Sequence, residues 1–264
     1  MMRIFVFALM LATPLTSVLA AEPVGKTLAA KKIVRAAGDQ GKRVLEPGAD
    51  IFFMDRISTS GTGLGEFQFS DGTKLAVGPL ASIVVDEFIA KGKSSYKKFG
   101  LAAAKGSFRW ISGRSASSAY SIETPRGTMG IRGTVLDFTL RYGRVYVALV
   151  SGKATFCGGS CQTLRNPCDF IEVRGGNVSE AQPVASAFSS RRAAAGIFPF
   201  LGNPRQLSAP FRAGGSACLS GLPAEDPRRQ DQGLREGNKG SEIPPDPTPP
   251  RSPLDQGGGE INIE

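Results

Sequence analysis

Short runs of β-branched and aromatic residues, broken by Gly, Asp-Gly and Pro, fill the chain from residue 42 to about residue 184. In several runs apolar and polar side chains alternate, which is the period of a strand with one buried face. Turn signals recur about every 8–12 residues, a spacing typical of antiparallel all-β domains. We therefore predict an all-β fold with a single antiparallel β-domain over residues 42–184, built as a sandwich, a roll or a twisted β-helix.

The clearest predicted hairpin spans residues 67–77. Phe67 and Phe69 alternate with polar residues, and Asp71-Gly72 then supplies the dipeptide typical of a type I′ turn. The alanine run at residues 102–104 favours a helix by propensity, but its short length and flanking glycines favour a strand. A loop is expected over residues 91–98. In the strand that follows the alanines, Phe108 and Trp110 should share one face.

The character of the sequence changes on both sides of this domain. Residues 21–41 are rich in Ala, Lys and Gly and are expected to form a leader of uncertain order. Residues 185–220 should form a short helical and apolar extension, with one helix over 187–196. Its apolar patch at 197–201 either docks on the β-domain, which we favour, or contacts a partner. From residue 221 to residue 264 Pro, Gly and charged residues dominate, so we predict a disordered acidic tail.

The first 20 residues are arranged like a removable export signal. Arg3 gives a positive start, residues 4–11 form a continuous apolar run, and Val18-Leu19-Ala20 supplies the small residues required for cleavage before Ala21. The apolar run is shorter than the roughly 18 residues that a spanning helix needs, and no later segment is long enough. We therefore expect a periplasmic or secreted protein with no transmembrane segment in the mature chain.

The cysteines fit an oxidising compartment, in which disulfides form and persist. They are Cys157, Cys161, Cys168 and Cys218. Cys157 and Cys161 flank a glycine turn, and a bridge between them would leave Cys168–Cys218; a Cys157–Cys168 bridge closing the whole loop is an equal alternative. The spacings are not of the C-x-x-C type and the chain has no histidine, so no metal site is expected.

Charge is distributed unevenly along the chain, which has a formal net charge of +9. Loss of the export signal with Arg3 leaves +8, and the −4 of residues 221–264 then leaves +12 for residues 21–220. A solvated cationic surface accounts for this without a specific partner, although an acidic protein or an anionic polymer would also suit it. Nucleic acid is not expected, because the basic residues are dispersed and an exported protein meets little of it.

Catalytic groups are scarce. Without histidine, the usual base for a serine or cysteine nucleophile is missing. Asp86 and Glu87 are neighbours that would point to opposite faces of a strand, which is unsuitable for a shared site. Glu123 and Asp137 are expected on solvated faces of their strands. We therefore expect neither an enzyme nor a bound cofactor.

Residues 124–134 read T-P-R-G-T-M-G-I-R-G-T and lead into a run of strand formers at 135–140. Pro125 fixes its own φ and biases Thr124 towards an extended conformation. Glycine at every third position permits tight turns or close backbone approach. Arg132 is the residue whose chemistry exceeds packing: its guanidinium could bind a carboxylate of a partner or hold loop carbonyls of its own fold, and we favour the second.

This segment closely resembles the signature of the FecR domain, a periplasmic sensor domain named after the ferric-citrate regulator. The residues that carry the signature are Thr124, Pro125, Gly130, Ile131, Arg132, Gly133 and Thr134. The resemblance runs from about Val44 to Phe156, through an entry strand at 48–59, a D-G-T turn followed by G-P at 69–79, and V-S-G-K at 150–153. It implies a β-module that contacts another protein.

Membrane-anchored relatives with this domain carry a cytoplasmic anti-sigma segment and a transmembrane helix before it. Here an export signal precedes the domain, so we expect a stand-alone exported protein that does not control a sigma factor directly. The expected function is a non-enzymatic binding or signal-relay module of the cell envelope, with an envelope protein as partner. The alternative is a structural or adhesive protein that binds anionic surface polymers through its basic core.

Overall fold

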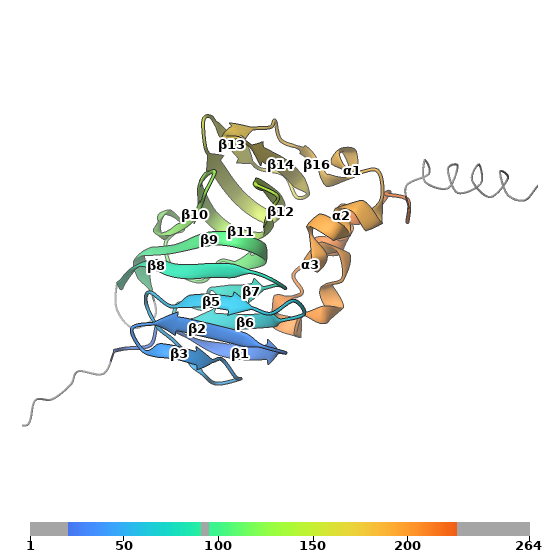
Figure 1. Cartoon of the computed structure of the whole chain (residues 1–264). Helices are drawn as coiled ribbons and strands as arrows, with labels where there is room; N and C mark the ends of the chain where they lie inside the picture. The colour runs from blue at the N-terminus through green and yellow to red at the C-terminus, as the bar shows by residue number, and fades with distance from the viewer. Residues whose placement is uncertain (1–20, 91–94, 226–264) are drawn as a thin grey trace, which may run out of the picture. The chain divides into compact units, whose positions relative to one another are not determined.

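A computed structural model of the chain describes residues 21–90 and 95–225. The predicted export signal at residues 1–20 lies outside the described residues, as do residues 226–264 of the predicted tail. Strands dominate the part of the chain that is described and helices are few, so the all-β prediction is confirmed. The N-terminal strands β1 to β3 lie at one end of the fold, and β13, β14 and β16 lie at the other (Figure 1).

The described strands form one mixed sheet. Their bounds are β1 (Gly25–Lys31), β2 (Val34–Gly38), β3 (Gly41–Val44), β4 (Asp50–Ile51), β5 (Arg56–Thr59), β6 (Leu64–Phe69), β7 (Lys74–Val77), β8 (Ser82–Ala90), β9 (Tyr96–Ile111), β10 (Tyr120–Thr124), β11 (Gly127–Arg141), β12 (Arg144–Cys157), β13 (Cys161–Leu164), β14 (Asp169–Arg174), β15 (Asn177–Val178) and β16 (Gln182–Pro183). All pairings are antiparallel except that of β9 with β10, which is parallel.

Residues 25–38, expected to belong to a leader of uncertain order, form β1 and β2, because Val34 and Ala36 alternate with Arg35 and bury one face. Residues 96–98 of the predicted loop belong to β9, and residues 91–94 lie outside the described part. The alanine run at 102–104 is also part of β9, so the strand prediction is confirmed there.

The hairpin predicted at residues 67–77 is present as β6 and β7, but its turn is not of type I′. A type I′ turn at Asp71-Gly72 requires a positive φ at both residues, and only Gly72 has one (+86°). The Gly72 N–H donates to the Phe69 carbonyl at 2.9 Å. In this conformation the Asp71 side chain points inward and is buried.

The sheet bends sharply within its longest strands. The first half of β9 pairs with β8 and β10, and its second half pairs with β7 and β11. Gly106 lies between the two halves with φ +106°, and a Cβ atom there would come within 2.2 Å of the Ala81 Cβ. Only glycine fits this close approach. The bend lets β9 continue from the part of the sheet that contains β8 and β10 into the part that contains β7 and β11.

One core fills the space inside the folded sheet. Phe69 of β6 and Phe99 of β9 are on strands that do not pair, yet their ring centroids are 4.6 Å apart. Phe108 and Trp110 are both fully buried in the same core, which confirms that they share a face. Burial of these large aromatic side chains is the main stabilising contribution of this layer pair.

A C-terminal extension of residues 184–225 packs on the outer surface of the sheet, against β6, β7, β12 and β14. Its helices are α1 (Val184–Ala187), α2 (Arg191–Ile197) and α3 (Pro199–Gly202), followed by the 3₁₀ turns η2 (Pro204–Gln206), η3 (Ala209–Phe211) and η4 (Gly215–Leu219). The helix predicted over 187–196 is shorter and begins at Arg191, because Ser190 caps α2 by accepting from the Ala193 N–H at 3.2 Å. No helix of the described residues is long and apolar enough to span a membrane.

The apolar patch at residues 197–201 docks on the β-domain, as the sequence predicted. Phe198, Phe200 and Leu201 are buried, and the ring centroids of Phe198 and Phe170 of β14 lie 6.0 Å apart. Leu222, at the start of the predicted tail, is buried in one cluster with Phe198 and Leu201. The extension therefore forms two smaller apolar clusters with the outer surface of the sheet.

Candidate functional site

The first half of the 124–134 motif is a two-residue hairpin. Pro125 and Arg126 form the turn between β10 and β11, in which Thr124 pairs with Gly127. The Thr124 hydroxyl donates to the Gly127 carbonyl at 2.7 Å and accepts from the Arg126 N–H at 3.2 Å. Gly127 has φ +143°, and a Cβ atom there would lie 2.2 Å from the Cys157 carbonyl oxygen. This part of the motif is architectural.

The second half of the motif builds a bend in both β11 and β12. Gly133 has φ +55° and the strand register shifts between Arg132 and Val135. Gly152 on β12 approaches so closely that a Cβ atom would lie 2.2 Å from the Gly133 carbonyl oxygen. The buried Thr134 hydroxyl lies 2.8 Å from the Arg132 carbonyl oxygen and 2.7 Å from the Lys153 carbonyl oxygen. Thr134 therefore fixes both strands where they bend.

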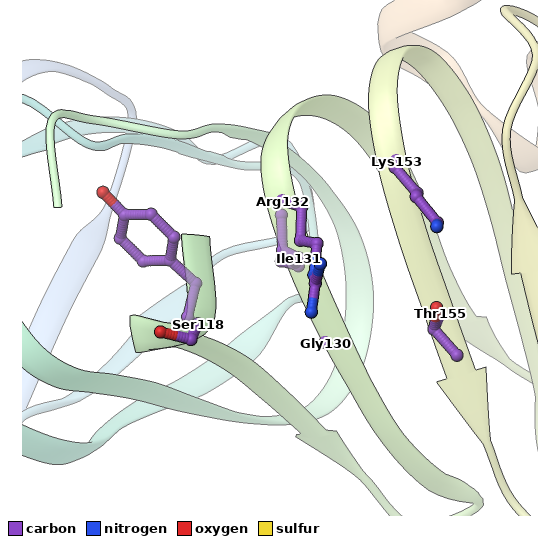
Figure 2. A pocket seen from close by; sticks show the side chains of 7 residues that line it. Ser118, Gly130, Ile131, Arg132, Lys153 and Thr155 are labelled. Carbon is purple, nitrogen blue, oxygen red and sulfur yellow. The ribbon is translucent and has the colours of Figure 1, made fainter. Parts of the chain in front are cut away.

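This bend places Arg132 and Lys153 directly opposite each other. They are Cα partners in the antiparallel pairing of β11 and β12. Figure 2 shows the two side chains on adjacent ribbons, just beside the arch that each ribbon makes. Like charges directly opposite each other on neighbouring strands repel, so the pair is unfavourable unless an anion lies between or above them.

A shallow pocket of about 230 Å³ lies beside the two cations. It is lined by Ser118, Tyr120, Gly130, Ile131, Arg132, Lys153 and Thr155. Gly130 has no side chain to fill it, and a Cβ atom at this position would meet nothing within 4 Å. Gly130 thus keeps the floor of the pocket open, where the sequence suggested only a tight turn or a close backbone approach.

The guanidinium of Arg132 is exposed and makes no hydrogen bond or ion pair to any residue that the structure describes. The Lys153 ammonium group likewise forms no ion pair within the described ranges 21–90 and 95–225. The expectation that Arg132 holds loop carbonyls of its own fold is therefore not met, because Thr134 takes that role. Two cations, one pocket and the Ser118 hydroxyl give a site with the chemistry of a carboxylate or other oxyanion receptor.

One wall of the pocket is supported by a buried carboxylate that sequence reasoning assigned only to a turn. The Tyr120 hydroxyl donates to Asp71 Oδ2 at 2.6 Å, and the Ser115 hydroxyl donates to the same atom at 2.7 Å. Burial raises the pKa of the Tyr120 phenol, and the neighbouring Asp71 carboxylate raises it further. The phenol therefore stays protonated and holds the pocket wall to the β6–β7 turn.

Asp137 was expected on a solvated face, and this prediction is wrong. Its side chain is almost fully buried and forms two hydrogen bonds with Arg109, Nε to Oδ1 at 2.6 Å and Nη2 to Oδ2 at 2.8 Å. Burial raises the pKa of the Asp137 carboxyl, and the Arg109 guanidinium opposes this rise. The C-terminal extension covers the pair, which its local sequence could not reveal. Glu123 is exposed as expected, so these two carboxylates do not form a shared site.

The structure pairs Cys157 with Cys161 and Cys168 with Cys218. The first bridge closes the β12–β13 hairpin, and the second attaches the C-terminal extension to the segment that leads into β14. Of the two alternatives that the sequence left open, the Cys157–Cys161 and Cys168–Cys218 pairing is the one present, and a Cys157–Cys168 bridge is not. Among the described residues, no group of three or more Cys, Asp or Glu side chains is placed to hold a metal ion.

The family model described as FecR protein matches residues 55–155, which contain the hairpin, both bends and the pocket residues. Residues 55–155 are a FecR domain. The sequence resemblance, drawn from about Val44 to Phe156, is thereby confirmed. The Arg132–Lys153 pair lies within the matched range of this FecR domain, and the C-terminal extension lies outside it.

Two crystal structures of a "putative anti-sigma factor" from Parabacteroides distasonis ATCC 8503, at 2.50 Å and 1.65 Å resolution, are similar to the chain. Sequence identity is 14% and 13%, with TM-scores of 0.41 and 0.38. Each alignment covers 48% of this chain and 59% of the other. No curated protein matched the sequence significantly.

Proposed function

We propose that this protein is a regulatory binding module that acts outside the cytoplasm, and that its FecR domain binds an acidic segment of a protein partner through the Arg132–Lys153 pocket. A FecR domain is a signalling or regulatory module, which favours a protein partner over a substrate. The observation that carries the proposal is the pair of opposed cations with no internal counter-charge. A folded chain tolerates such repulsion where an external anion relieves it.

Location outside the cytoplasm is supported by two kinds of observation. The sequence has an export-signal pattern at residues 1–20. The structure pairs all four cysteines in disulfides, which persist in oxidising compartments and are rare in the cytosol. Fractionation of cells, with N-terminal sequencing of the recovered chain, tests this part: cleavage before Ala21 and recovery from the envelope or medium are expected.

The binding part is tested by affinity purification from an envelope extract. The wild-type chain is compared with an Arg132→Gln/Lys153→Gln variant and with a control, Lys42→Gln/Arg56→Gln, which removes two exposed cations elsewhere on the sheet. We expect one stoichiometric protein with the wild type and with the control, and its loss with the Arg132→Gln/Lys153→Gln variant. Equal recovery from all three would contradict the proposal.

The same experiment addresses the alternative function. A structural or adhesive protein would be retained on anionic polymers through its dispersed positive charge. In that case retention falls steeply with salt and falls equally in both double variants, because each removes two positive charges. No stoichiometric protein partner would then be recovered.

A further inference from the structure

A second surface, separate from the Arg132–Lys153 pocket, has two large apolar side chains that point into solvent. Leu80 is 62% exposed and Tyr142 is 81% exposed, and both line a groove of about 430 Å³ at the end of β11. Pro79, Leu140 and Pro199 complete its apolar walls. The groove shares no lining residue with the pocket beside Arg132.

The backbone holds both side chains in place at an energetic cost. Leu80 has φ +53° and Tyr142 has φ +52°, a region that residues with a large side chain rarely adopt. Tyr142 and Gly143 (φ +71°) form the β11–β12 turn, a type I′ geometry in which Asn, Asp or Gly usually occupies the first position. Leu80 follows Pro79 at a turn position that usually holds Gly or Asn. Two turns therefore each carry an exposed apolar residue where a small polar one would fit better.

The rim of the groove is positively charged. Lys105 and Arg141 line it, and Arg126 lines an adjoining hollow that shares Lys105, Arg141 and Tyr142. Arg141 lies over the Tyr142 ring at 4.6 Å and donates to the Gly196 carbonyl at 3.2 Å. Arg126 donates to the Gly143 carbonyl at 2.9 Å.

These contacts fix the two guanidinium groups without neutralising them. None of Lys105, Arg126 and Arg141 forms an ion pair with a residue of the described chain. Arg144 has Glu172 as its partner at 2.8 Å, so it adds little to the charge of the rim.

We propose that the groove around Leu80 and Tyr142 is a docking site for a partner polypeptide that presents one large apolar residue flanked by Asp or Glu. The apolar residue would enter between Leu80 and Tyr142, and the flanking carboxylates would meet Lys105, Arg126 and Arg141. The +12 charge of residues 21–220 opposes a second copy of this chain as the occupant. The concave form of the surface favours a polypeptide over a lipid bilayer, which a protruding apolar surface would suit better.

The test is a selection of random peptides displayed on phage against the immobilised full chain, with counter-selection against a Leu80→Asn/Tyr142→Asn variant. Asn tolerates the left-handed backbone, so the variant removes the apolar side chains without straining the fold. We expect enriched peptides with an aromatic residue or Leu between acidic residues. The proposal is overturned if basic peptides are enriched, or if every enriched peptide binds the wild type and the variant equally.

An enriched peptide is then synthesised and titrated calorimetrically. Affinity should fall at least about tenfold in Tyr142→Asn, the size expected for the loss of a central aromatic anchor. Met54→Asn is the matched control, since Met54 is also exposed with φ +63° but lies outside the groove, and it should retain wild-type affinity.

Two further outcomes decide against the proposal. One is an unchanged affinity in Tyr142→Asn. The other is strong binding of phosphatidylglycerol vesicles that the Leu80→Asn/Tyr142→Asn variant loses, which would indicate a membrane surface as the occupant. An Arg132→Gln/Lys153→Gln variant should still bind the selected peptide, so this test and that of the proposed function fail independently.

Discussion

The Asp137–Arg109 and Arg132–Lys153 pairs lie on β11 on opposite sides of its bend, and they differ in charge, in burial and in their hydrogen bonds. Asp137 faces Arg109 of β9, with opposite charges, hydrogen bonds at both oxygens and almost complete burial. Arg132 faces Lys153 of β12, with like charges and no internal partner among the described residues. The first pair is satisfied within the fold. The second pair has no counter-charge among the described residues.

The C-terminal extension accounts for the difference in burial between the two pairs. It covers the layer that contains Arg109, whose Nη1 donates to the Phe211 carbonyl at 3.3 Å. On the same layer, the buried Glu66 carboxylate accepts from the Ser208 N–H at 2.7 Å and also from the Ser208 hydroxyl. Polar groups of this layer thus find partners in the extension. Arg132 remains exposed, so the protein has one outer surface used for its own stability and one available for binding.

The largest expected effect comes from breaking the buried pair. Asp137→Ala leaves the Arg109 guanidinium buried without a counter-charge, so the free energy of unfolding should fall by about 3–5 kcal/mol. Chemical denaturation monitored by circular dichroism measures the change. The control is Arg109→Met/Asp137→Leu, which removes both charges and should recover most of the lost stability. If Asp137→Ala loses no more stability than the double variant, the pair does not stabilise the fold in the way described above.

Next in size is the bridge that ties the extension to the sheet. Cys168 and Cys218 are 50 residues apart, and a Cys168→Ser/Cys218→Ser variant should lose about 2–4 kcal/mol of stability. The bridge between Cys157 and Cys161 closes a separation of only 4 residues, so its removal should cost less. Both variants are compared by denaturant titration. The reverse order of losses would contradict the view that the extension is held mainly by the longer bridge.

The local sequence pattern predicted the strands, because their signal comes from residues that are close in the chain. The alternation at 67–70 and 107–111 identifies strands because a side chain buried every second residue is a local property. Asp137 and Glu66 were beyond such reasoning. Both are polar residues at positions where the alternation predicts an outward-facing side chain. They are buried because the extension, which is distant in sequence, covers them.

The Arg132–Lys153 pair, in contrast, could have been found. Residues equidistant from the Tyr142-Gly143 turn face each other, as Arg141 and Arg144 do, and Lys153 is the position equidistant with Arg132. Arg132 and Lys153 stay opposite each other because the irregularity at Gly133-Thr134 is compensated by one at Gly152 on the opposite strand. The sequence marked Arg132 but not its partner, since the register was not followed across the bends.

A smaller effect is expected at the bend that aims the exposed pair. Thr134→Val keeps the side-chain shape but removes a buried hydroxyl that contacts the carbonyls of Arg132 and Lys153, and it should cost about 1–3 kcal/mol. Thr128→Val, on the exposed surface of the same strand, should be close to neutral and serves as the control. Partner binding in the purification assay should weaken in Thr134→Val alone. Unchanged stability and binding would remove the link between the motif and the pocket.

The smallest expected effect distinguishes the two pairs most sharply. Lys153→Glu converts the like-charged pair into an opposite-charged one, so stability should rise by about 0.2–1 kcal/mol, near the lower limit because Arg132 is exposed. High salt should abolish the gain, because screening weakens surface pairs. The same substitution places a carboxylate where the partner's carboxylate would bind, so partner recovery should be lost. A protein that becomes slightly more stable while losing its partner is the signature of a residue kept for binding. The control is Lys42→Glu, at an exposed position opposite Ala37, which should change neither stability nor partner recovery. A loss of stability in Lys153→Glu would instead indicate that the Arg132–Lys153 pair has a structural role.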